Sequence, residues 1–286
     1  MQTAETKLVD LHTHSTASDG TLTPAGLVEL AYKTGLSAIA LTDHDTVAGI
    51  EEAINTSFPI EVIPGIELSA GYGNGDIHIL GLYIDHTSEL LKKMAHDMVE
   101  EREWRNYEMC KRLRGGGVDI SVEKLRNGNN DMVLTRGHFA RYMIDHGYSK
   151  DKADAFKHYL GVDTPYFVKR RYLSPEECVR LILDCGGTPV LAHPIIYNLP
   201  ATELEALVAR LKKAGLAGIE AIYSTYTNQD EEIVRSLAHR YSLLLTGGSD
   251  FHGANKPEIS IGSGMGNLKI PYSLLEKIKE VRKYAV

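Results

Sequence analysis

The chain alternates short apolar runs with amphipathic helical patterns over most of its length, and this alternation constrains its fold most strongly. The first run, Val9–Thr13, precedes a helical pattern over 24–34, which Thr23 can cap and Gly35 can end. Such alternation is typical of βα units that build a parallel sheet. It predicts further strands over 38–42, 61–66, 77–84, 188–192, 218–222 and 243–246, and further helices over 47–55, 175–185, 201–214, 229–241 and 272–284.

The pattern changes between 88 and 172, where helices replace the alternation. One long polar helix is predicted over 89–114, before a run of three glycines, and shorter helices around Glu123, over 136–146 and over 150–160. We interpret 88–172 as an inserted helical subdomain, and 1–87 with 173–286 as the catalytic domain. Seven strands interleaved with helices predict an α/β fold, a distorted (β/α)7 TIM-like barrel, rather than an open doubly wound sheet.

Composition places the chain among soluble globular proteins. Hydrophobic residues make up 43% and charged residues 24%, and no apolar run approaches the roughly 18 residues that a membrane span needs. The polar start, residues 1–7, contains no hydrophobic signal core, so we expect a cytoplasmic protein that binds no membrane. No obligate protein partner is indicated.

The distribution of charge suggests that an anion is handled locally. The net charge is −7, yet residues 88–173 hold 17 Lys and Arg against 13 Asp and Glu, which leaves 14 against 25 elsewhere. A basic segment within an acidic protein suits an anionic substrate, although a solvated helical face explains part of the excess. No glycine-rich phosphate loop of the Rossmann or Walker type is present.

The three cysteines are expected to be small core residues. Cys110, Cys178 and Cys185 are odd in number and lack C-x-x-C spacing, which argues against a disulfide framework or a thiolate metal site. Any metal site in this chain should therefore use nitrogen and oxygen ligands.

Histidine and carboxylate residues follow the predicted strands. Active sites of α/β barrels lie at the carboxyl ends of the strands, so residues far apart in sequence converge there. A single histidine at a strand end is more often a packed or hydrogen-bonded residue, but nine candidates in compact motifs reverse that expectation. These candidates are His12, His14, Asp19, His44, Glu67, His78, His193, Asp250 and His252.

The spacing within these motifs suits metal binding. Residues i and i+2 of a strand point to the same face, so His12 and His14 can bind one ion, as can Asp250 and His252 if that segment is extended. Imidazole and carboxylate without thiolate favour zinc, manganese or iron. The other six histidines fall in predicted helices or loops, and among them His138 stands out as a further candidate.

These motifs resemble the signature blocks of the PHP family, named for polymerase and histidinol phosphatase. The matching segments run from Asp10 to Gly253, and they read DLHTHS with DG, LTDHD, GIE, AHP and SDFHG. The resemblance implies a distorted seven-stranded barrel that holds two or three divalent metals. It places His12, His14, Glu67 and Asp250 on one metal; Glu67, His78 and His193 on a second; and Asp19, His44 and His252 on a third.

The expected chemistry is phosphoester hydrolysis. Clustered dications neutralise a phosphate ester and lower the pKa of a bound water, so a metal-bridging hydroxide is the expected nucleophile. Asp43 and His193 are candidates for moving protons. Each has an alternative: Asp43 as a carboxylate that orients a ligand, and His193 as a plain ligand.

The insertion resembles that of one PHP subgroup, in which it covers the metal site. The cue is Thr135-Arg136-Gly137-His138 followed by Lys169, Arg170 and Arg171, although the subgroup often has proline where this chain has Gly137. The resemblance implies that these basic residues hold a nucleotide; a solvated hinge is the alternative for 169–171. Arg136 lies at a predicted helix start, where the dipole also favours an anion.

Members of this subgroup remove the 3′-phosphate of nucleoside 3′,5′-bisphosphates or degrade short 5′-phosphorylated RNA from its 5′ end. We expect the first activity, on a small phosphorylated substrate, because no long basic stripe with interleaved aromatics is visible. The alternatives are a 5′-3′ exoribonuclease and a histidinol-phosphatase-like enzyme. An amidohydrolase and a non-catalytic metal-binding module are less well supported.

Overall fold

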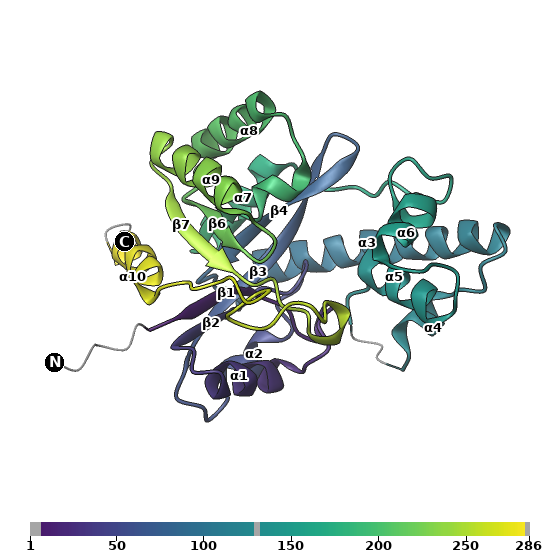
Figure 1. Ribbon diagram of the computed structural model, residues 1–286, viewed down its shortest axis with the longest axis horizontal. Coiled ribbons are helices and arrows are strands. Elements are labelled where there is room, and N and C mark those ends of the chain that lie inside the picture. Colours follow the sequence, from purple (N-terminus) through teal and green to yellow (C-terminus); the bar gives the residue numbers. More distant parts are fainter. Residues whose placement is uncertain (1–6, 129–131, 284–286) are drawn as a thin grey trace.

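The computed structural model describes residues 7–128 and 132–283, and its central feature is a seven-stranded sheet that curls into a nearly closed barrel (Figure 1). Strands β1 and β7 meet where the Asp250 amide donates to the His12 carbonyl at 2.9 Å and the His14 amide donates to Phe251 at 3.0 Å. The predicted distorted barrel is therefore confirmed. Its strands, in sheet order, are β1 (Val9–Thr13), β2 (Ala38–Leu41), β3 (Glu61–Tyr72), β4 (Gly75–Leu82), β5 (Thr188–Leu191), β6 (Gly218–Tyr223) and β7 (Leu244–Gly248).

The expectation of a purely parallel sheet is wrong at β4, which runs antiparallel to both β3 and β5. Strand β3 extends to Tyr72, six residues beyond its predicted end, and pairs with β4 across a two-residue turn at Gly73 and Asn74. Gly73 has φ +58°, the left-handed conformation that such tight hairpins favour. So short a connection cannot form a parallel crossover, which needs a dozen or more residues.

The helices that follow the strands of the barrel cover the outside of the sheet or close one end of the barrel. Thr23 and Ser174 cap two of them, each accepting a hydrogen bond from a backbone amide of the first turn. The expected helix 47–55 is shorter than predicted, because residues 47–49 form turns instead. Two parts of the predicted segments lie outside the described residues. They are residues 1–6 of the polar start and Tyr284, the predicted last residue of the final helix. The helices are α1 (Pro24–Lys33), α2 (Ile50–Ile54), α7 (Pro175–Asp184), α8 (Ala201–Ala214), α9 (Asn228–Arg240) and α10 (Tyr272–Lys283).

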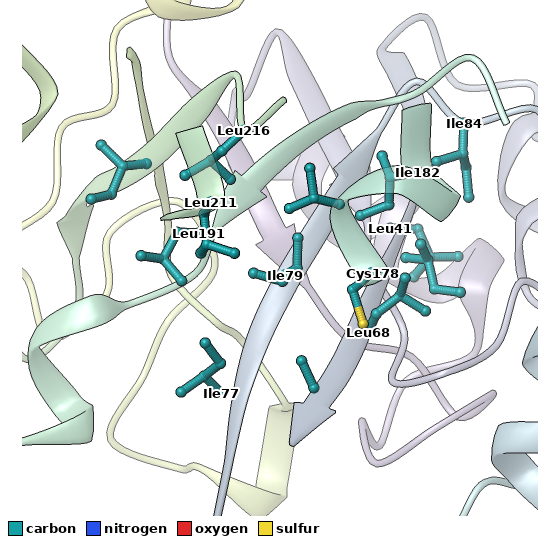
Figure 2. Close-up of a cluster of buried hydrophobic side chains, with 14 of the residues drawn as sticks. Leu41, Leu68, Ile77, Ile79, Ile84, Cys178, Ile182, Leu191, Leu211 and Leu216 are labelled. Atoms are coloured by element: carbon teal, nitrogen blue, oxygen red, sulfur yellow. The ribbon is translucent and has the colours of Figure 1, made fainter. Parts of the chain in front are cut away.

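Two apolar cores hold the barrel together. The inward faces of the strands form one, including Val9, Ile63 and Leu80, and α10 contributes Leu275 and Ile278 to it. The second lies between the outer face of the sheet and the surrounding helices, where Ile79 and Leu191 of the strands meet Ile182 of α7 and Leu211 of α8 (Figure 2). The strands carry apolar side chains on both faces because both faces are buried.

The segment between β4 and α7 projects from the barrel and has a core of its own (Figure 1). Phe139, Met143 and Leu160 are buried in that core against the distal half of the longest helix. The predicted helix over 150–160 is interrupted, since its second half is a π-helical turn. The helices of this segment are α3 (Glu89–Gly115), α4 (Val122–Arg126), α5 (Arg136–Asp145) and α6 (Lys152–Ala155), followed by the π-helical turn η1 (Phe156–Leu160).

Helix α3 joins the two parts of the molecule. Its first half buries Leu91 and Met98 against the outer core of the barrel, whereas its second half buries Met109 and Leu113 in the core of the projecting segment. The protein therefore carries a helical insertion on the barrel. The boundaries predicted for it, 88 and 172, stay a prediction.

The buried Asp45 carboxylate ties this insertion to the barrel at two points. Its Oδ2 accepts hydrogen bonds from Arg102 of α3 and, at 3.0 Å, from Arg170 at the far end of the insertion. Its Oδ1 accepts from the Ser69 amide of β3 at 2.8 Å. The Asp45 side chain therefore connects three separate segments: strand β3, helix α3 and the end of the insertion.

Two expectations about the whole chain can be compared with the structure. Cys110, Cys178 and Cys185 are all free and buried, as predicted. No helix within 7–128 or 132–283 is long and apolar enough to cross a membrane.

Phe139→Ala is expected to destabilise the insertion. Phe139 is fully buried, and removing such a ring from a core costs about 3–5 kcal/mol in the free energy of unfolding. Urea denaturation followed by circular dichroism would measure the change. The matched control is Tyr107→Ala on α3, where the ring is 58% exposed and the expected change is below about 0.5 kcal/mol. Equal effects of the two substitutions would contradict the assignment of this core.

Asp45→Asn is expected to lower the free energy of unfolding at pH 7 by about 3–5 kcal/mol, because it leaves two buried guanidinium groups without their anion. Burial alone would raise the pKa of Asp45, but Arg102 and Arg170 outweigh it and bring the pKa below the ordinary 3.8. The stabilisation is therefore complete above about pH 4 and declines as the pH falls through the lower, folded-state value. The stability difference between the wild type and the variant should narrow in acid, and a constant difference would contradict this account.

Candidate metal centre

Toward one end of the barrel, the inward-facing side chains of β3 and β4 change from apolar residues to a glutamate and a histidine. On β3 the inward residue Ile63 is followed at even spacing by Glu67, and on β4 Leu80 is preceded by His78. Because β4 is antiparallel, its beginning lies at the same end as the carboxyl ends of its neighbours. His78 therefore reaches the mouth from the start of a strand, whereas the others do so from strand ends.

The Glu67 carboxylate is the centre of the site, and it is buried. Five histidine rings from four strands or the loops after them surround it. Its Oε2 lies 3.3 Å from Nε2 of His12, 3.2 Å from Nε2 of His14 and 3.0 Å from Nδ1 of His44, and its Oε1 lies 2.8 Å from Nδ1 of His78 and 3.1 Å from Nε2 of His193.

Two further carboxylates complete the cluster on the side of β7. Asp250 Oδ1 lies 3.2 Å from Nε2 of His14 and 3.3 Å from Nδ1 of His252. Asp19, from the loop after β1, places Oδ1 3.1 Å from Nε2 of His252 and Oδ2 3.8 Å from Nε2 of His44. All nine expected positions thus come together in one cluster at the barrel mouth.

The donor atoms of this cluster suit cations. Several are buried and have no hydrogen-bond partner among the described residues, including Nε2 of His12 and His14, Oε2 of Glu67 and Oδ1 of Asp19. Buried polar atoms without partners are rare, and a coordinated ion explains such a group. Three overlapping sets have donor atoms close enough to hold an ion: His14 with Asp19, His44 and His252; His12 with His14 and Glu67; and His44 with Glu67 and His78.

Electrostatics keep the carboxylates of the cluster anionic. Burial would raise the pKa of Glu67, but the neighbouring rings, above all His78 and His44, bring it well below its ordinary value. The pKa of Asp250 also lies well below its ordinary value, because Lys256 and His252 outweigh the effect of burial. Anionic carboxylates between imidazole rings form the ligand set that borderline divalent metals prefer.

The histidines differ in the protonation that their surroundings favour. Burial lowers the pKa of His252 to about 4, helped by Lys256, and also lowers the pKa of His193. For His14, burial is outweighed by Asp250 and Glu67, which raise its pKa to about 9. Since a ligating imidazole must be neutral, cations and protons compete for His14.

Glu220 of β6 supports the cluster from below, and the sequence analysis did not identify it. Its fully buried carboxylate lies 3.1 Å from Nδ1 of His12 and accepts the His193 amide at 2.8 Å. This leaves Nε2 of His12 facing Glu67. A single carboxylate within the apolar run Gly218–Tyr223 was the available signal, because a buried charge requires a partner.

Asp250 is oriented by two further side chains that sequence reasoning missed. Tyr223 donates its hydroxyl to Oδ2 at 2.6 Å, and the Lys256 ammonium lies 2.5 Å from the same oxygen. Only Oδ1 then faces the histidines. Asp250 has φ +56° and His193 has φ +27°, conformations that non-glycine residues rarely adopt and that concentrate at functional sites.

Asp43 lies beside the cluster and outside the sets that could hold an ion. Its Oδ1 accepts the Ser15 amide at 2.8 Å and the Ser18 hydroxyl at 2.6 Å, and its Oδ2 accepts the Ser15 hydroxyl at 2.7 Å. These contacts hold the turn that leads to Asp19. His193, the other candidate for moving protons, directly faces Glu67.

Arg136 lies at the mouth, at the first position of α5. Its Nη2 donates to Oδ1 of Asp76 at 2.9 Å, and both residues line a cavity of about 300 Å³ with His44, His78 and His252. His138, two positions later, is buried, and its Nδ1 accepts the Thr135 amide at 3.0 Å. Thr135 in turn donates its hydroxyl to Asp19 at 2.7 Å. The start of α5 is thus attached directly to the cluster.

The basic segment 169–171 does not reach that cavity. Arg170 is buried against Asp45 and lies over the Tyr172 ring, with its guanidinium carbon 4.3 Å from the ring centroid. Lys169 and Arg171 line a different groove of about 770 Å³, beside Trp104. Arg170 borders this groove as well, so the three basic residues lie together beside Trp104 and outside the cavity at the barrel mouth.

Comparison with known proteins identifies the family of this chain. The sequence profile of the PHP domain matches residues 10–166. The Escherichia coli 5′-3′ exoribonuclease Rnm is 35% identical over 249 residues, which cover 86% of this chain and 85% of that protein. The Chromobacterium violaceum 3′,5′-nucleoside bisphosphate phosphatase is 33% identical over 257 residues, which cover 89% and 90%.

Solved structures share the whole fold. A Chromobacterium violaceum protein described as an amidohydrolase, with bound sulfate and no metal, is 32% identical, superposes with a TM-score of 0.83 and covers 89% of each chain. A Bifidobacterium adolescentis protein proposed to be a metal-dependent phosphoesterase is 28% identical, with a TM-score of 0.83 and coverage of 97% and 98%. From the barrel, its ligand cluster and these relatives, we conclude that the chain belongs to the PHP family and is a metal-dependent phosphoesterase.

Proposed function

We propose that this phosphoesterase removes a phosphate monoester from a nucleotide, namely the 3′-phosphate of nucleoside 3′,5′-bisphosphates. The observation that carries the proposal is the shared cavity, in which the Arg136 guanidinium and the metal-ligand cluster line one space of about 300 Å³. That volume is at the small end for a ligand pocket and suits a single nucleotide rather than a polymer. The relative from Chromobacterium violaceum, which acts on such bisphosphates, supports the choice.

We propose that two or three divalent ions, manganese, zinc or iron, occupy the cluster. The assignment is His12, His14, Glu67 and Asp250 to one ion, Glu67, His78 and His193 to a second, and Asp19, His44 and His252 to a third. The short distances from Asp250 to His14 and from Glu67 to His193 support it. The groups of donor atoms within reach of one ion agree with it in part, since they also place His14 with Asp19, His44 and His252, and His44 with Glu67 and His78. Bound there, such ions would offset the charge of the ester and generate a nucleophile from water.

The remaining residues have roles that follow from their contacts. Glu220 and Lys256 orient ligands, and Asp43 holds the turn before Asp19, so we propose a positioning role for all three rather than proton transfer. His193 faces Glu67 and is proposed as a ligand. Arg136 supplies a forked donor for the substrate, since its guanidinium is held at the mouth by Asp76.

A second candidate is a 5′-3′ exoribonuclease acting on short RNA. The relatives from Escherichia coli and Haemophilus influenzae carry that activity in their names. The groove beside Trp104 also favours it, because this ring is 52% exposed and Lys169 and Arg171 line the same groove. An exposed aromatic ring beside basic side chains can stack a base and bind its phosphate. No described contact favours a histidinol-phosphatase-like reaction.

Glu220→Gln is expected to weaken metal binding by roughly 10- to 100-fold while the fold is retained, because it removes the charge that orients His12. Metal titration by calorimetry would measure the affinity, and circular dichroism would check the fold. Glu205→Gln is the control, since that residue pairs with Arg240 outside the site. Unchanged metal affinity in the Glu220 variant would contradict the positioning role.

Arg136→Ala is expected to raise KM for nucleoside 3′,5′-bisphosphates by roughly 10-fold or more, because a hydrogen bond to a charged group is lost. Turnover of a minimal aryl phosphate should change far less. Phosphate release from metal-loaded protein measures both, on a panel of mononucleotides, bisphosphates, short oligonucleotides and amides. Equal effects on both substrates would refute nucleotide recognition by Arg136, and amide turnover without phosphate release would refute the proposed function.

A further inference from the structure

Two cavities meet at the barrel mouth and form one cleft. The first, of about 300 Å³, is the one that Arg136 lines beside the metal-ligand cluster. The second, of about 320 Å³, is lined by Glu67 and Asp250 together with residues that follow β6 and β7. Because the two cavities share ligands of the proposed metal ions, the reacting phosphate and the oxygen that leaves it lie beside the shared residues. These are His44, His78, Lys152, Ile196 and Lys256.

Lys152 is the one of these five residues that the insertion carries. It is the first residue of α6, whose Ala155 is buried in the core of the insertion. Asp151 caps this helix by accepting the Asp154 amide at 2.8 Å. Phe156, four residues after Lys152 and so on the same side of the helical segment, lines the first cavity as well. The packing of α6 therefore directs Lys152 toward the metal-ligand cluster.

The ammonium of Lys152 has no partner in the described part of the chain. No hydrogen bond or ion pair joins it to another side chain within 7–128 or 132–283. Lys256, by contrast, is bound to Oδ2 of Asp250 at 2.5 Å. Exposed lysines without partners are common on protein surfaces, but this one lies inside the cleft, where its side chain remains open to solvent. Its ammonium is therefore available to a substrate.

The reaction needs a proton donor, and the other donors of the cleft are committed elsewhere. Negative charge builds on the leaving oxygen as a phosphoryl group departs. The histidines at the mouth are proposed ligands, and Tyr223 and Lys256 both donate to Asp250. The arginines do not release a proton near neutral pH. Of the basic and phenolic side chains described as lining the two cavities, Lys152 alone is left.

The charges around Lys152 make its proton easier to release. Partial removal from water inside the cleft lowers the pKa of Lys152 below its ordinary 10.5, and Lys256 lowers it further, whereas Asp250, Asp19 and Glu258 act in the opposite direction. A general acid works best when its pKa lies near the working pH. Lys152 is therefore better suited to donate a proton than an ordinary surface lysine.

We propose that Lys152 is the general acid of the reaction and protonates the oxygen that leaves phosphorus. As the bond between phosphorus and that oxygen breaks, its electron pair stays on the oxygen and takes the proton from Nζ, which gives an alcohol and a neutral amine. The oxygen of the attacking water forms the new bond to phosphorus. That water releases one proton to solvent and the amine regains one. The inference rests on phosphoester hydrolysis at the metal cluster, whichever ester is the substrate.

The test compares esters whose leaving groups differ in their need for a proton. Phenyl phosphate releases a phenol like that of tyrosine, with a pKa of about 10. Its partner, 4-nitrophenyl phosphate, releases a much more acidic phenol. The second pair is adenosine 3′,5′-bisphosphate and its analogue with sulfur in place of the bridging 3′-oxygen, because a thiol has a pKa of only about 8.5. For each ester, kcat/KM is measured for metal-loaded wild type and variants.

Lys152→Met should lower kcat/KM for phenyl phosphate and the bisphosphate by roughly 100-fold or more, and for their partners far less. Lys152→Arg should show the same loss, because arginine keeps the charge but does not release its proton. Wild-type activity on phenyl phosphate should decline as the pH rises through the lowered pKa of Lys152, and Lys152→Arg should lose this decline. Lys157→Met, which removes an exposed charge of η1 outside both cavities, should leave the rates unchanged.

Three outcomes would overturn the role of Lys152. Equal losses for both members of a pair would show that it binds the phosphate or supports the fold. Full activity of Lys152→Arg on phenyl phosphate would show that the charge suffices, and unchanged rates in Lys152→Met would show that the residue is dispensable. Each pair tests Lys152 independently. A wild type that hydrolyses the aryl esters but not the bisphosphate refutes the proposed substrate, and the aryl pair still decides the role of Lys152.

Discussion

The buried carboxylate of Glu67 is the constraint on which the rest of this molecule depends. Five imidazole rings from four strands or the loops after them approach its two oxygens, because a buried negative charge must be compensated by nearby positive charge. The barrel brings those strands to one rim, and Glu220, Tyr223 and Lys256 fix the ligands from behind. Much of the polar interior is therefore explained by the need to hold one charged centre.

A second buried carboxylate, Asp45, connects this centre to the insertion. It follows His44 directly and binds Arg102 of α3 and Arg170 at the insertion's end, so a ligand-bearing loop and both ends of the insertion share one electrostatic contact. Thr135 makes a second connection through Asp19. Arg136, for which we propose a role in recognition, is thus connected through Thr135 at the start of α5 to Asp19, one of the proposed metal ligands.

Much of the fold and the ligand cluster could be predicted from sequence, because strand periodicity places ligands reliably. Strand β1 was predicted with its observed bounds, and each of the nine proposed ligands lies in the cluster. The antiparallel β4 was missed because apolar runs carry no information on strand direction. Glu220 was missed because it is one charged residue within an otherwise apolar strand, and the separation of Lys169 and Arg171 from the cavity depends on the path of the backbone.

The direction of β4 has a consequence for how the insertion is built. Strand β4 ends at the floor of the barrel, opposite the mouth, because it is antiparallel to its neighbours. The chain must then return along the outside of the barrel, and α3 does so as one continuous helix, which rises about 20 Å from Glu89 to Arg102 at 1.5 Å per residue. The number of residues in the first half of α3 therefore determines the direction in which Arg102 and Arg105 point. One added or deleted residue there would rotate both side chains by about 100° around the helix axis, away from the mouth.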